Sequence, residues 1–201
     1  MQLFTLEDYA VPAPPAAVAL GTFDGVHLGH RALLRKTVLA ARQNGLIACA
    51  YTFDVPPAAV LGRHPTAALT DIAAKAALMG ECGIETVVYS RFDAQVAARS
   101  AESFFRDVLL EKLNARHVVI GFHYHFGQYA RGDAALMRSF CREAGIGLTV
   151  VEPVCLSDGA LISSSAVRRC LAENNRPRAE EMLNRPLSQR EEALLGGRYD
   201  E

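Results

Sequence analysis

The 201-residue chain has few of the features that mark several large protein classes. Its five cysteines are scattered without a C-x-x-C pair, which argues against a disulfide framework and favours a reducing compartment. The formal net charge is only −1, so no overall field attracts nucleic acid or anionic lipid. No apolar run approaches the roughly 20 residues that span a bilayer, and the first residues carry acids but no basic segment typical of a signal peptide. We therefore expect a cytoplasmic protein with no nucleic-acid or membrane partner.

Half of the residues are hydrophobic, and they fall in short apolar runs that alternate with longer segments of helical period. This alternation predicts an α/β fold with a parallel sheet and helices on both faces. We expect strands at Ala16–Leu20, Leu46–Phe53, Glu85–Tyr89, His117–Gly121 and Gly147–Val154. The predicted helices cover about 29–44, 71–82, 101–113 and 133–144, with Asp71 and Ser100 as N-caps. A proline-rich segment over about 54–70 is expected to form a loop or flap, and a capping box at Ser188–Glu191 predicts a short C-terminal helix.

The strongest local signal is the segment Gly21–His30, which reads GTFDGVHLGH and follows an apolar strand. Glycines let the backbone approach a ligand closely, and Gly29 opens a helix whose free amides favour phosphate. His27 and His30 lie three residues apart at that helix entry. Two imidazoles there can stabilise the charge that builds on a phosphoryl group during transfer. Alternatives are plain polar residues at a helix start, or a zinc site made by His27 and His30 with His123 and His125.

Two further segments carry polar or aromatic side chains in an order that could bind a ligand. Three hydroxyls at Ser163, Ser164 and Ser165 open a helix, with Arg168 one turn later, which suits a triphosphate; the alternative is a serine N-cap and a solvated arginine. The strand His117–Gly121 runs into the aromatic loop FHYHFG. In a sheet ordered 3-2-1-4-5 this loop would face His27 and His30, where its aromatics either stack on a ring system or plug the loop into the core.

These residues resemble, in the same order, the FAD synthetase (FMN adenylyltransferase) module of the bacterial bifunctional riboflavin kinase/FAD synthetases. The resemblance runs from about Val18 to Pro186 and closes on Arg185-Pro186. It implies a Rossmann-like nucleotidyltransferase fold with a five-stranded parallel sheet of order 3-2-1-4-5, over residues 1–186, followed by a short helix or tail at 187–201. It also implies attack of the FMN phosphate on the α-phosphorus of ATP, with Mg²⁺, to give FAD and pyrophosphate.

The family pattern also implies roles for residues of this chain. On matching positions, the catalytic residues are His27, His30 and Arg168. The expected ATP-binding residues are Gly21, Thr22, Phe23, Asp24, Gly29, Ser163, Ser164 and Ser165. The expected FMN-binding residues are Thr52, Phe53, His123, Tyr124 and Phe126, and no side chain is assigned as a metal ligand.

Four departures from the family pattern concern mainly the acceptor. His123 stands where the family has an oxygen-bearing side chain, and Val55-Pro56 replaces the proline-histidine of the flap. Asn184 and Leu187 replace glycine and tyrosine beside Arg185-Pro186, and the chain is too short for the kinase module. We therefore expect a separate riboflavin kinase to act upstream. The alternatives are a nucleotidyltransferase with another phosphorylated acceptor, or a flavin- or nucleotide-binding protein without turnover.

Overall fold

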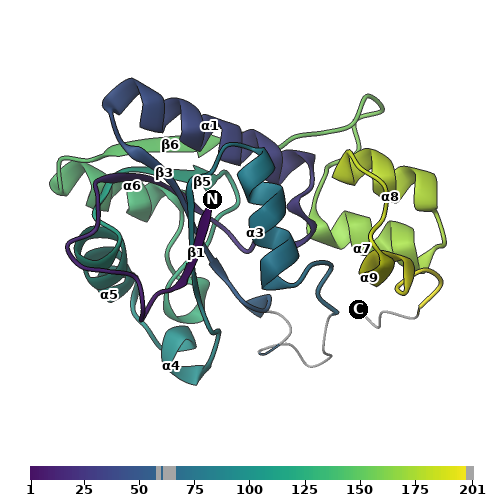
Figure 1. Ribbon diagram of the computed structural model, residues 1–201, viewed down its shortest axis with the longest axis horizontal. Coiled ribbons are helices and arrows are strands. Elements are labelled where there is room, and N and C mark those ends of the chain that lie inside the picture. Colours follow the sequence, from purple (N-terminus) through teal and green to yellow (C-terminus); the bar gives the residue numbers. More distant parts are fainter. Residues whose placement is uncertain (58–59, 61–66, 198–201) are drawn as a thin grey trace.

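The computed structural model describes residues 1–57, 60 and 67–197, and its centre is a parallel sheet (Figure 1). The sheet order is β1-β4-β3-β2-β5-β6. The strands are β1 (Gln2–Thr5), β2 (Ala16–Leu20), β3 (Ile47–Phe53), β4 (Thr86–Ser90), β5 (Ala115–Gly121) and β6 (Gly147–Val151). The predicted fold and the order of its five strands, now β4-β3-β2-β5-β6, are confirmed.

The predicted strand count was wrong by one, because β1 adds a sixth strand at the edge. It pairs in parallel with β4, with Gln2 opposite Thr86. Its four residues, QLFT, are exposed or half-buried, so they lack the apolar run that marks the inner strands. At the opposite edge, β6 ends at Val151 rather than at Val154, because Pro153 has no amide hydrogen for the ladder.

The helices lie close to their predicted positions. They are α1 (Leu28–Asn44), α3 (Ile72–Glu81), α4 (Ala94–Ala97), α5 (Ala101–Ser103), which continues as the π-helix η2 (Phe104–Lys112), and α6 (Ala134–Glu143). Two 3-10 turns are η1 (Asp24–Val26) and η3 (Gln128–Ala130). Asp71 caps α3 by accepting from the Ala74 amide at 2.8 Å, and Ser100 caps α5 by accepting from the Ser103 amide at 3.1 Å. These two predicted N-caps are therefore present.

Each face of the sheet has its own apolar layer. Val18 and Ile120 pack with Leu109 and Met137 against η2 and α6. Ala19 and Val119 pack with Leu34 and Met79 against α1 and α3. Neighbouring residues of one strand thus serve opposite layers, which is the two-residue period of a strand buried on both faces.

The C-terminal helices gather beside the sheet at one end of the molecule (Figure 1). They are α7 (Ser164–Ala172), α8 (Arg176–Leu183) and α9 (Gln189–Glu192), packed around Leu171, Leu183 and Leu187. Ser188 and Glu191 form the capping box of α9, and buried Glu191 pairs with Arg185 at 2.6 Å. Of the predicted flap at 54–70, residues 58–59 and 61–66 lie outside the described residues. Within the described ranges, no helix has the length and apolar character needed to cross a bilayer.

Candidate functional site

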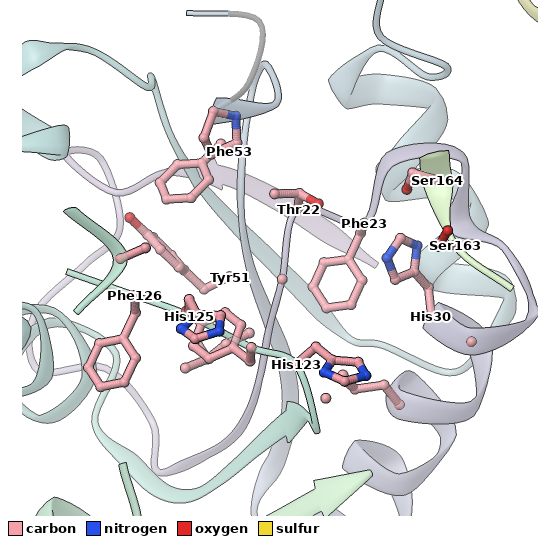
Figure 2. A pocket seen from close by; sticks show the side chains of 18 of the residues that line it. Thr22, Phe23, His30, Tyr51, Phe53, His123, His125, Phe126, Ser163 and Ser164 are labelled. Carbon is pink, nitrogen blue, oxygen red and sulfur yellow. The ribbon is translucent and has the colours of Figure 1, made fainter. Parts of the chain in front are cut away.

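A cavity of about 740 Å³ opens at the carboxyl ends of the strands. The last residue of each strand from β2 to β6 lines it, namely Leu20, Phe53, Ser90, Gly121 and Val151. This is the edge at which open parallel sheets bind ligands. Twelve of the residues predicted for the site line the cavity: Gly21, Thr22, Phe23, His27, Gly29, His30, Phe53, His123, Tyr124, Phe126, Ser163 and Ser164. In Figure 2, Phe23, His30, Ser163 and Ser164 lie at one end and Tyr51, Phe53 and Phe126 at the other, with Thr22 between them.

The loop before α1 has a tightly turned backbone. Phe23, Gly25 and Val26 have positive φ angles of 49°, 79° and 45°. The turn brings His27 to the N-cap of α1, where its Nδ1 accepts a hydrogen bond from the His30 amide at 3.3 Å. A neutral ring that accepts at Nδ1 must carry its proton on Nε2. A Cβ at Gly29 would lie 3.2 Å from the His27 ring, so glycine leaves that ring its space.

The two histidine rings stack on each other beside the cavity. Their centroids are 3.6 Å apart with an interplanar angle of 19°, and the ring centroids of Phe23 and His30 lie 5.2 Å apart in an edge-on arrangement. Burial lowers the pKa of His27 to about 4. Burial, then the charges of His27 and Lys75, lower the pKa of His30 well below its usual range. Both rings are therefore neutral near pH 7, and His30 Nδ1 has no hydrogen-bond partner among the described residues.

The serine run faces the histidines from the start of α7. Ser163 is the N-cap and accepts from the Ala166 amide at 3.1 Å, while the Ser164 hydroxyl donates to the Asp24 carbonyl at 2.9 Å. Both line the cavity, so the N-terminus of α7 and that of α1 border the same space. Ser165 is exposed and does not line it.

Asp24 and Arg168 pair with each other and do not line the cavity. Asp24 is 1% exposed, and its carboxylate also accepts from the amides of Leu69 at 3.2 Å and Thr70 at 3.0 Å. Arg168 Nε donates to the Ala67 carbonyl at 3.1 Å. The pair thus connects the loop before α1, the segment before α3 and helix α7.

The residues predicted to bind FMN likewise include some that line the cavity and one that does not. Thr52 is fully buried, and its hydroxyl donates to the Thr22 carbonyl at 3.0 Å, so it supports the loop from behind. His123 and Tyr124 line the cavity with Phe126, which is also buried and stacks with Tyr124 at 5.8 Å. Phe126 therefore belongs to both the core and the cavity wall, which supports the core alternative for this loop, and stacking on a ring system stays a prediction.

Several other lining residues at the aromatic end were not predicted as site residues, among them Tyr51, Ser90, Phe92, Arg99 and Phe104. They come from three separate segments. Phe92 and Phe104 belong to Phe92-Asp93 and Ser103-Phe104-Phe105, which also match the family pattern but carry no sign of a site by themselves. Only the folded sheet brings the five residues to one cavity.

The cavity lining contains few acids, Glu7 and Glu152. Among the described residues, no three histidine, cysteine, aspartate or glutamate side chains gather as they would around a metal ion. The zinc alternative built on His27, His30, His123 and His125 therefore has no support in the structure.

Comparison with known proteins agrees with this geometry. The FAD synthetase family model matches residues 11–166. A putative bifunctional riboflavin kinase/FMN adenylyltransferase of Geobacillus thermodenitrificans is 35% identical over 87% of this chain and 93% of the relative. The bifunctional riboflavin kinase/FMN adenylyltransferase of Escherichia coli K12 is 33% identical over 88% of this chain and 56% of its own length.

A similar solved structure is a protein from Streptococcus pneumoniae described as a macrolide-efflux protein. It superimposes with a TM-score of 0.81 at 26% identity, over 93% of this chain and 61% of that one. The likeness supports the fold, and efflux is stated only of that protein. The match over most of the chain confirms the predicted family and enzyme class: the chain belongs to the FAD synthetase family.

Proposed function

We propose that this chain is an FMN adenylyltransferase, which transfers AMP from ATP to FMN and releases pyrophosphate. The observation that carries the proposal is the stacked pair of neutral histidines at the start of α1, which shares one cavity with the start of α7. The opposite end of that cavity is aromatic, as a planar fused-ring acceptor requires. The FAD synthetase family supports the choice of acceptor.

In the proposed reaction, an oxygen of the FMN phosphate forms a bond to the α-phosphorus of ATP. The bond between the α-phosphorus and the bridging oxygen to the β-phosphate breaks, and pyrophosphate leaves with the electron pair. Negative charge grows on the phosphate oxygens during this exchange, so the protein contributes mainly position and electrostatics.

His27 supplies a fixed donor in this scheme. Because its Nδ1 accepts a hydrogen bond from the His30 amide, its Nε2–H is free to donate to a non-bridging phosphate oxygen. His30 provides an unpartnered Nδ1 within the same stack. The free amides at the starts of α1 and α7, with Ser163, bind the triphosphate.

Arg168 has a positioning role in this proposal, which differs from the catalytic role that the motif suggests. Its guanidinium is held by Asp24 and by the Ala67 carbonyl, away from the cavity. We infer that the pair keeps the Gly21–His30 loop and α7 in register, so that His27 and Ser163 border one phosphate site.

The residues present fit Mg²⁺ that arrives with ATP. Mg²⁺ keeps several waters and binds substrate phosphates through few protein groups, so it needs no cluster of acids. Glu152, a carboxylate in the cavity lining, would be available to hold the hydrated ion, which would screen the charge of the triphosphate. We further propose that a riboflavin kinase supplies the FMN.

The test incubates the protein with ATP, Mg²⁺ and FMN and separates FAD from FMN by chromatography, with pyrophosphate measured in parallel. His27→Asn, which removes Nε2, and His30→Ala, which removes Nδ1, each lower kcat by about 10²–10³-fold, the effect of removing one donor to a developing anion. The control is His117→Asn, because His117 bonds Thr149 on the sheet and does not line the cavity. Absence of FAD at high enzyme concentration overturns the proposal, and full turnover by both active-site variants overturns the role of the histidines.

A further inference from the structure

The aromatic end of the cavity has a small polar patch, formed by Tyr51, Ser90 and Arg99. Rings surround it: Phe53 meets Phe92 edge-on at 5.0 Å, and Tyr51 lies 5.7 Å from Phe53 and 5.8 Å from Phe104. A polar patch inside an aromatic wall selects ligands, because buried polar groups need partners.

Tyr51 and Ser90 form the inner part of this patch. Their side chains come from adjacent strands and are almost wholly buried, at 3% and 2% exposure. The Tyr51 hydroxyl donates to Ser90 Oγ at 2.8 Å. Because Ser90 Oγ accepts from Tyr51, its own hydrogen is available, and among the described residues its side chain makes no other hydrogen bond. Ser90 therefore offers one donor to a ligand.

Arg99 forms the outer part. It follows α4, lines the cavity and is half-buried. Among the described residues, its guanidinium takes part in no hydrogen bond or ion pair, whereas Arg168, outside the cavity, is paired with Asp24. Burial raises the pKa of Tyr51, the Ser90 hydrogen bond and the charge of Arg99 oppose that rise, and the charge of Glu7 adds to it, so Arg99 and Glu7 both lie within electrostatic reach of the patch. Its five N–H donors have a fixed planar geometry that suits carbonyl oxygens.

We propose that Ser90 and Arg99 bind the pyrimidine edge of the acceptor's isoalloxazine ring and so determine specificity for a flavin. This inference rests on the proposed function. One edge of that ring has two carbonyl oxygens on either side of an N–H, and the other has only methyl groups. With the pyrimidine edge inward, the carbonyls accept from Ser90 and Arg99. With the methyl edge inward, the same donors are desolvated without partners, which is unfavourable.

The experiment measures FMN in two ways, by KM in the FAD assay and by Kd from quenching of FMN fluorescence, with Arg99→Met and Ser90→Ala. Hydrogen bonds that involve a charged donor predict a rise of about tenfold or more in KM and Kd for Arg99→Met, with a smaller rise for Ser90→Ala. The kcat and the KM for ATP stay within about twofold of wild type, because the phosphate site is untouched. Arg91→Met is the matched control, since Arg91 is exposed and does not line the cavity.

A second probe needs no variant. A methyl group on the N3 of the ring, in 3-methyl-FMN, blocks the pyrimidine edge, so the wild-type protein binds this analogue more weakly than FMN by a similar factor. Equal binding of FMN and 3-methyl-FMN, or unchanged Kd for FMN in Arg99→Met, overturns the inference. If wild type binds FMN in an Arg99-dependent way but forms no FAD, the proposed function fails and the inference stands.

Discussion

The buried pair of Asp24 and Arg168 allows a quantitative test of how the site is held together. Replacement of Asp24 by alanine removes the acceptor for Arg168, whose side chain is only 12% exposed. It also removes the acceptor for the amides of Leu69 and Thr70. Loss of one partner of a buried ion pair costs about 3–5 kcal/mol, because the remaining charge is uncompensated. The amides of Leu69 and Thr70 also lose their acceptor, but relaxation of the backbone around them reduces the free-energy cost of leaving them unpaired. We therefore expect the free energy of unfolding to fall by about 3–5 kcal/mol.

Urea unfolding followed by circular dichroism measures this loss. The control is Glu192→Ala, which breaks the exposed ion pair with Arg176 at 2.8 Å, both side chains being 43% exposed. That loss is small, because water screens the pair. A double variant, Asp24→Leu with Arg168→Met, removes both charges and should be more stable than Asp24→Ala. A loss below about 1 kcal/mol in Asp24→Ala would refute the reasoning.

Two further predictions concern the histidines and the aromatic loop. The pKa of His27 is about 4 in the folded protein against 6.5 when unfolded, so only the unfolded chain gains a proton at this site as pH falls through that window. The contribution of this group to the free energy of unfolding is complete above about pH 6.5 and declines by roughly 3 kcal/mol toward pH 4. Urea unfolding across that range should show a shallower decline in His27→Asn than in wild type. An identical decline in the two proteins contradicts the assignment. Gly127 has φ +72° and a Cβ there would lie 2.7 Å from the Ala101 amide nitrogen, whereas Gly145 has φ +66° with nothing within 4 Å. Gly127→Ala should therefore destabilise more than Gly145→Ala and raise the KM for FMN, and equal effects on both measurements would rule out the steric argument.

Much of the fold could be predicted from local patterns. The inner strands are apolar runs buried on both faces, such as the wholly buried Ala16–Leu20, and such runs can be recognised without tertiary information. Helices α3 and α5 begin at aspartate and serine caps that are also local. Strand β1 could not be predicted, because its half-exposed residues become a strand only by pairing with β4.

In the candidate site, too, some features follow from local sequence and others depend on tertiary structure. The sequence by itself determined which two segments begin the helices at the cavity, because the Gly21–His30 loop and the serine run follow from helix starts and backbone turns of a few residues. It could not show that Asp24 and Arg168, 144 positions apart, neutralise each other away from the cavity. Nor could it show that Ser90 and Arg99 line the same cavity. Those arrangements depend on which strands and helices become neighbours, and only tertiary packing determines which buried charges pair and which donors remain for a ligand.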